Sequence, residues 1–126
     1  MENRIINSNN APAPIGPYSQ AIFANNTLYV SGQIALDPSS GHLKTQNITE
    51  ETNQIMANLE SILMAANMTF SNVVKCTIFV KDLNNFSTIN EAYAKFFKHD
   101  PPARETVEVS RLPKDVNVEI SCIAVS

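Results

Sequence analysis

The order of apolar and polar residues along the chain predicts two helices. The first is expected over residues 49–66, where apolar side chains return at every third or fourth position and would line one helix face. Thr49 is its expected N-cap and Asn67 its expected C-cap. The second is expected over residues 84–98 and ends before Pro101, which cannot continue a helix. The apolar positions are Ile55, Met56, Leu59, Ile62, Leu63 and Ala66 in the first helix and Phe86, Ile89, Tyr93, Phe96 and Phe97 in the second.

Short runs of β-branched and aromatic residues predict the strands. Residues 18–23 and 27–33 form a hairpin across Ala24-Asn25-Asn26, because asparagine tolerates the positive φ of tight turns. Residues 73–80 are dense in β-branched residues and only Lys75 is charged, as in a central strand. Two further strands follow the second helix. This order predicts an α+β fold, a mixed sheet of about six strands with both helices packed on one face.

The last two strands each have a polar side and an apolar side. In the strand that begins at Arg104, Thr106 and Glu108 alternate with Val107 and Val109. In the final strand, Glu119 lies opposite the apolar set, which is Val116, Val118, Ile120, Cys122 and Ala124. If the valines face the helices, Arg104 and Glu119 share the polar face of the sheet. The turn between the two strands does not fix their register, so no contact between the two side chains is predicted.

Composition fits one domain over residues 1–126, since 44% of the residues are hydrophobic and the pattern has no break. A net charge of -3 and scattered lysines and arginines weigh against nucleic acid as a partner. The N-terminal residues lack the apolar core of a signal peptide and no later run could span a bilayer, so we expect a cytoplasmic protein. In that reducing compartment, Cys76 and Cys122 are expected to be buried free thiols.

Several kinds of site have no matching pattern. His42 and His99 lack the spacing of metal ligands, no Cys-x-x-Cys occurs, and three glycines cannot build a phosphate-binding loop. We therefore expect no metal and no cofactor. A Ser-His-Asp arrangement stays open on spacing alone, although no Gly-x-Ser-x-Gly motif supports it.

Arg104 is the residue best placed for chemistry. It follows Pro101 and Pro102, which hold the chain extended, and its planar, permanently charged fork suits the bidentate capture of a small carboxylate. The ordinary alternative is a surface arginine in a salt bridge with an acidic neighbour, and Glu119 could equally be a solvated strand residue. The polar and turn residues that could accompany Arg104 are Tyr18, Ser31, Gly32, Asn90, Thr106 and Glu119.

Long segments of the chain resemble the reactive intermediate deaminases, the RidA type of the YjgF family. The matching segments are residues 13–21, 30–34, 73–86, 102–104 and 109–115. They occur in the family's order and span nearly the whole chain, which makes the likeness far more specific than one short motif. The resemblance implies a chorismate-mutase-like α+β domain that forms a homotrimer with three clefts between neighbouring subunits.

The resemblance also implies an activity, the hydrolysis of reactive 2-enamine and 2-imino acids, such as 2-aminoacrylate and 2-iminobutyrate, to 2-oxoacids and ammonia. Carried over by position, Arg104 would hold the substrate carboxylate and Glu119 would orient or activate the water. Family members often have cysteine where Thr106 stands, which leaves the role of that position open. The implied lining residues of the cleft are Tyr18, Ser31, Gly32, Asn90 and Thr106.

Two other functions stay open on the residues alone. A binding or regulatory protein that senses small 2-oxoacids in the same cleft without turnover would need the same arginine. A role as ribonuclease or translation inhibitor has been attached to members of this family. The acidic balance of the chain and its lack of basic and aromatic patches weigh against the second of these.

Overall fold

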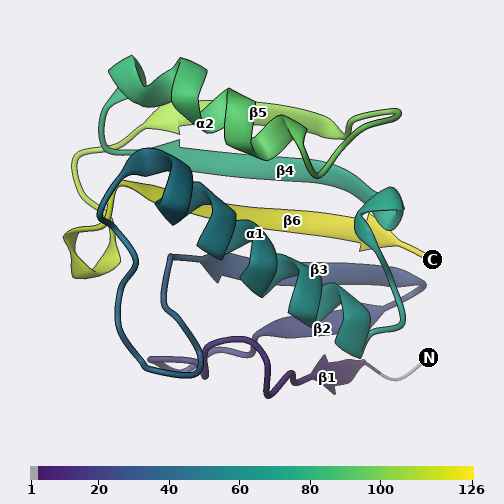
Figure 1. The fold of residues 1–126 in the computed structure, drawn as a ribbon. Helices are drawn as coiled ribbons and strands as arrows, with labels where there is room; N and C mark the ends of the chain where they lie inside the picture. Colours follow the sequence, from purple (N-terminus) through teal and green to yellow (C-terminus); the bar gives the residue numbers. More distant parts are fainter. Residues whose placement is uncertain (1–2) are drawn as a thin grey trace.

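The computed structural model describes residues 3–126 and shows a single sheet whose one face is covered by helices (Figure 1). Six strands lie in the order β1-β2-β3-β6-β4-β5. Neighbouring strands are antiparallel except β4 and β5, which are parallel. The predicted α+β fold with a mixed sheet is confirmed. The strands are β1 (Arg4–Ile6), β2 (Ala21–Ala24), β3 (Thr27–Gln33), β4 (Val73–Val80), β5 (Ala103–Glu108) and β6 (Val118–Val125).

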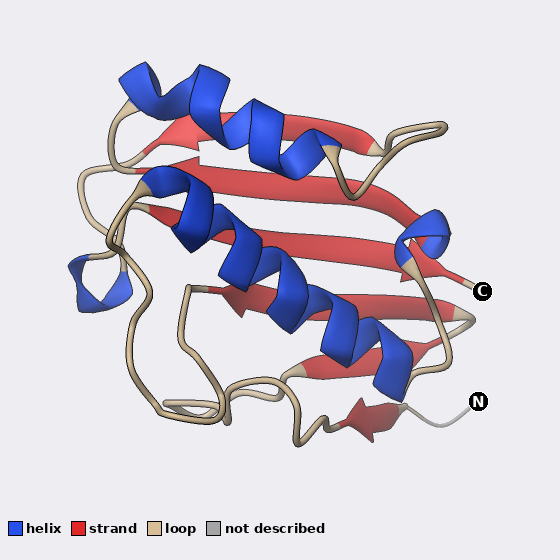
Figure 2. Cartoon of the chain, in the orientation of Figure 1, coloured by secondary structure: helices blue, strands red, loops and turns tan. Residues whose placement is uncertain are grey.

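Helices α1 (Ile48–Ala65) and α2 (Phe86–Ala94) lie on the same side of the sheet, as Figure 2 shows. The N-cap of α1 is Asn47, whose side-chain oxygen accepts a hydrogen bond from the Glu50 backbone N–H at 2.8 Å. The predicted N-cap at Thr49 was wrong, because an asparagine two residues earlier already satisfies the free N–H groups of the first turn. Asn67 follows the C-cap Ala66 and takes the left-handed conformation, with φ of +59°.

Helix α2 is shorter than predicted. Its last residue is Ala94, and the chain then leaves the helix so that the rings of Phe96 and Phe97 pack on Phe70, with centroids 5.5 and 5.3 Å away. This aromatic cluster, rather than Pro101, ends the helix. Short 3₁₀ helices stand at Phe70–Asn72 (η1), Leu83–Asn85 (η2) and Pro113–Asp115 (η3).

The core lies between the two helices and the sheet. Cys76 and Cys122 face each other across β4 and β6 in this core, both buried and unbonded, which confirms the two predicted free thiols. Among residues 3–126, no helix is long and apolar enough to cross a membrane. The largest fully buried apolar side chains are Leu28, Ile55, Met56, Leu59, Ile62, Leu63, Ile78, Ile89 and Ile120.

The predicted hairpin joins β2 and β3, and Asn25 and Asn26 both have positive φ in its turn. The first strand of this hairpin begins at Ala21 rather than at Tyr18. Further along β3, the pairing with β6 shifts register between Val30 and Gln33. This irregularity places Ser31 and Gly32 beside β6, where the candidate site begins.

Candidate active site

Arg104 and Glu119 lie on opposite faces of the sheet. Arg104 is in register with Cys76, whose side chain points toward the helices, whereas Glu119 is in register with Phe79, which points to the open face. The expectation that the two residues share one polar face was therefore wrong. Val107 shows why: it is 43% exposed on the open face, so the valine of β5 does not face the helices. β5 is an edge strand, and the positions that it turns toward α2 are polar.

On the helix side, the Arg104 guanidinium lies beside two aromatic rings of α2. Its Cζ atom is 5.6 Å from the Phe86 ring centroid and 5.0 Å from that of Tyr93, distances at which a cation is attracted to the ring face. Within residues 3–126 no carboxylate forms an ion pair with Arg104, so the salt-bridge alternative is wrong. The ion pairs of this part of the chain are Lys44–Asp37, Lys75–Glu105 and Lys81–Asp115.

Near Arg104, two hydroxyl groups have no hydrogen-bond partner of good geometry in the described chain. They belong to Thr106, two residues beyond Arg104 on the same face of β5, and to Tyr93, whose hydroxyl lies beside the Cys76 thiol. Burial raises the pKa of the Tyr93 hydroxyl, so this group stays a protonated donor. Buried polar groups are usually paired, so these two unpaired hydroxyl groups beside the guanidinium make the region a candidate for binding a polar partner.

Asn90 completes this group on α2. It lies one turn after Phe86 and one turn before Tyr93, so the three side chains share one side of the helix, and Asn90 is half-buried there. We refer to Arg104, Thr106, Asn90, Phe86 and Tyr93 as the arginine half-site. Its polar groups are donors and hydroxyls, which suit a small carboxylate.

On the open face, the Glu119 carboxylate lies directly against Gly32. A Cβ atom at position 32 would come within 2.7 Å of Glu119 Oε2, so only glycine leaves this space free. Burial raises the pKa of the Glu119 carboxyl above the ordinary glutamate value. A carboxyl tuned in this direction is better able to take and release a proton near neutral pH.

The loop before β2 brings Tyr18 and Ser31 to the same region. Ser31 donates its hydroxyl to the Ser19 carbonyl at 2.6 Å and its backbone N–H to the Gln20 carbonyl at 2.9 Å. The Tyr18 hydroxyl accepts the Ile15 backbone N–H at 3.2 Å, and the ring is 46% exposed. We refer to Glu119, Gly32, Ser31 and Tyr18 as the glutamate half-site.

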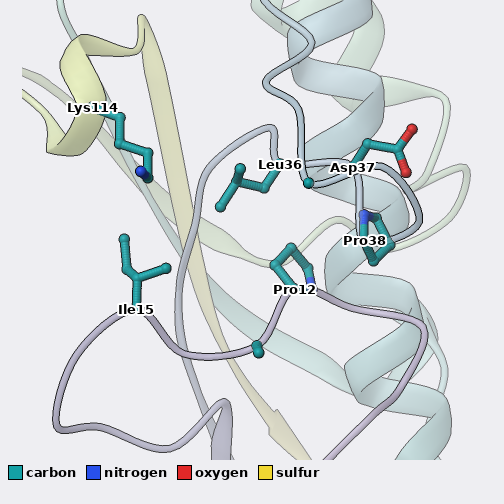
Figure 3. Close-up of a pocket in the computed structure, with 8 residues that line it drawn as sticks. Pro12, Ile15, Leu36, Asp37, Pro38 and Lys114 are labelled. Atoms are coloured by element: carbon teal, nitrogen blue, oxygen red, sulfur yellow. The ribbon is translucent and has the colours of Figure 1, made fainter.

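The space at the glutamate half-site is small within one chain. Tyr18 and Gly32 line a hollow of about 20 Å³, room for about one water molecule. A larger hollow of about 250 Å³ adjoins it, and the Lys114 side chain extends into it toward Leu36 while the Asp37 carboxylate points away (Figure 3). The two hollows share the lining residues Pro12, Ala13, Ile15 and Leu36.

Sequence reasoning named every member of the two half-sites except the aromatic residues Phe86 and Tyr93, and it gave Gln20 no role. Phe86 and Tyr93 were assigned to helix packing, whereas their rings also flank Arg104; their spacing of seven residues on one helix face was the available signal. Gln20 was missed altogether, although its buried side chain ties the preceding loop to β2 through the Ser8 and Pro12 backbone. Within residues 3–126, no group of three or more His, Cys, Asp or Glu side chains is placed to hold a metal ion.

Comparison with known proteins identifies the family. The family model described as endoribonuclease L-PSP matches residues 8–126. A RutC family protein of Pyrococcus horikoshii is 49% identical over 95% of this chain and 95% of its own length. Human 2-iminobutanoate/2-iminopropanoate deaminase is 46% identical over 97% of this chain and 89% of its own length. The crystal structure of Escherichia coli TdcF with bound serine superimposes with a TM-score of 0.94 at 38% identity, covering 98% of both chains.

These matches span nearly the whole chain, including both half-sites, at identities that establish common ancestry. The chain therefore belongs to the endoribonuclease L-PSP family, which is the YjgF/RidA family.

Proposed function

We propose that this protein hydrolyses 2-imino acids and their 2-enamine tautomers, such as 2-iminobutyrate and 2-aminoacrylate, to 2-oxoacids and ammonia. The observation that carries the proposal is the Arg104 guanidinium, which lies beside two aromatic rings without a carboxylate partner in the described chain. A planar cation prepared in this way suits the carboxylate that every such substrate carries. The relatives support it, since the human one is named as a 2-iminobutanoate/2-iminopropanoate deaminase.

Imine hydrolysis requires only that the protein bind the substrate, place one water and supply one acid-base group. Water adds across the C=N bond of the imine, and the resulting carbinolamine releases ammonia and leaves the 2-oxoacid. An imine conjugated to a carboxylate already reacts slowly with water, so holding the substrate and placing one water supply much of the acceleration. Glu119, with its raised pKa, would accept a proton from that water and return a proton to the departing nitrogen. Tyr18, Ser31 and Gly32 would line the cleft around it.

Because the two half-sites face opposite sides of the sheet, one chain does not bring Arg104 and Glu119 to the same substrate. We therefore propose that the cleft forms between identical subunits, with the arginine half-site of one chain meeting the glutamate half-site of the next. A closed ring of three chains would then hold three clefts. The bound serine in TdcF, a small molecule with the carboxylate that we assign to Arg104, agrees with a site for compounds of this size. We place this trimer in the cytoplasm.

Arg104 and Glu119 variants test this function. R104A should lower kcat/KM by about a hundredfold or more because the guanidinium both binds and orients the substrate, and R104K should be nearly as poor because an ammonium lacks the planar fork. E119Q should lower kcat more than it raises KM. The assay follows ammonia release and semicarbazone formation from freshly generated 2-aminoacrylate.

Two results would contradict the proposal. Unchanged imine hydrolysis in R104A would remove Arg104 from the site. A wild-type protein that binds 2-oxoacids through Arg104 without releasing ammonia would be a sensor rather than an enzyme. The family description names an endoribonuclease, but we do not propose RNA cleavage, because a net charge of -3 offers no attraction for a phosphate backbone.

A further inference from the structure

Helix α1 carries a fully buried carboxylate, that of Glu51, at its contact with the start of β6. Glu51 is 0% exposed, and no lysine or arginine of the described chain forms an ion pair with it. Its Oε2 atom accepts the backbone N–H groups of Asn117 and Val118 at 2.8 and 3.0 Å, and its Oε1 accepts the Asn117 side-chain amide at 2.8 Å. A buried charge is costly unless it is fully hydrogen-bonded, and here three N–H donors supply the bonds.

The donors belong to the two residues that come directly before Glu119. The first turns of α1 lie over the beginning of β6, where these residues are found (Figure 1). The Asn117 carbonyl is also held, because it accepts the Lys81 backbone N–H at 2.9 Å. The backbone leading into Glu119 is thus fixed from the helix side by Glu51, while its carboxylate rests against Gly32 on the open face.

We propose that Glu51 is a positioning residue for Glu119, which it holds in place by binding the backbone of Asn117 and Val118. The inference rests on the proposed function, because the water-activating role of Glu119 defines what must be positioned. Glu51 acts through the strand and does not touch the substrate.

The residue next to Glu51 on α1 provides a matched control. Thr52 is equally buried on the same turn of α1, and its hydroxyl has no hydrogen-bond partner in the described chain. An apolar side chain at position 51 could fill the same volume. It would leave the two backbone N–H groups without an acceptor, and the start of β6 would shift to find other partners.

The first experiment compares E51L, E51Q and the control T52V. E51L keeps the volume and removes the acceptor, so kcat for imine hydrolysis should fall by about tenfold or more while KM stays within about twofold. E51Q should keep nearly full kcat. Its carbonyl oxygen can accept both backbone N–H groups, and its NH₂ can donate to Asn117 once that amide turns over. T52V removes a hydroxyl without a partner and should leave both parameters unchanged.

A second pair of variants tests the positioning role of Glu51 if E51L does not fold. N117D sets two carboxylates against each other and should lower kcat, whereas E51Q/N117D restores a donor facing an acceptor and should recover it to within about twofold of wild type. The positioning role is refuted if folded E51L or N117D keeps wild-type kcat, if the double variant does not recover, or if kcat and KM change equally.

A readout without turnover separates this inference from the proposed function. The ¹³C signal of the Glu119 carboxyl, assigned by its loss in E119Q, should titrate with a pKa above the ordinary glutamate value in wild type and E51Q. In E51L the pKa should move down toward that value, because a displaced strand admits water. The variants leave the nearby charged groups unchanged: Lys75 pairs with Glu105 at 2.9 Å on the open face, Lys81 pairs with Asp115 at 3.0 Å beyond the end of β4, and Lys114 extends into the adjoining hollow.

The proposed imine hydrolysis and the positioning role of Glu51 can therefore be refuted independently. If wild type does not release ammonia but the Glu119 titration responds as described, the proposed function is wrong and the positioning role stands. If wild type is active and the titration is the same in wild type, E51Q and E51L, the positioning role is wrong and the function stands.

Discussion

Glycine at position 32 gives the Glu119 carboxylate the space that it occupies. In G32A the new methyl group would come within 2.7 Å of Glu119 Oε2, and the flexible carboxylate would swing away at little cost in stability. We expect kcat to fall by about tenfold with a small change in melting temperature. G41A is the matched control: Gly41 has φ of +75° and open space around it, so alanine there should cost about 1 kcal/mol of stability and leave kcat unchanged. Wild-type kcat in folded G32A would contradict the assignment.

At the residue scale, the sequence nominated candidate residues but could not predict which face of the sheet each of them occupies. Arg104 and Glu119 were nominated by side-chain chemistry and by family resemblance. The face of the sheet to which each side chain points depends on β4, which lies between β5 and β6 and pairs in a fixed register with both. Neither the turn between β5 and β6 nor the alternation within β5 shows which face of the sheet each side chain occupies. The sequence could not predict the contacts of Glu51 either, because its hydrogen-bond partners lie 66 and 67 residues away along the chain.

At the element scale, the N-cap of α1 offers a test of local structure. Because the Asn47 side chain binds the Glu50 backbone N–H, N47A should lower the free energy of unfolding by about 1 kcal/mol. T49A should change it by less than about 0.5 kcal/mol, since Thr49 lies inside the helix. Urea denaturation followed by circular dichroism measures both. A larger loss in T49A than in N47A would show that the cap has been misplaced.

Elements with a strong local pattern were predicted well, and elements shaped by distant contacts were not. Strand β4 begins and ends at the predicted residues, because a β-branched run bounded by polar residues is a local signal. Helix α2 ends four residues before the predicted end at Lys98, because its last aromatic residues pack on Phe70 instead of continuing the helical face. The helical spacing of these residues could not show that contact.

At the scale of the whole molecule, the sheet has one covered and one open face, and the open face has the composition of a contact surface. Tyr29 and Val107 are 51% and 43% exposed on it, together with the ion pair between Lys75 and Glu105. A surface that mixes apolar and polar groups suits packing against a copy of itself. This face also carries Glu119, so the assembly that we propose would cover the apolar residues and complete the cleft in one step.

Mixed oligomers of R104A and E119Q test the shared cleft most directly. If each cleft takes Arg104 from one chain and Glu119 from the next, neither variant is active alone, but random mixing by joint refolding gives about a quarter of the clefts both native residues. We expect about a quarter of wild-type imine hydrolysis in an equimolar mixture. If both residues served the same cleft from one chain, every cleft would lack one of them, and activity no higher than that of the separate variants would contradict the account.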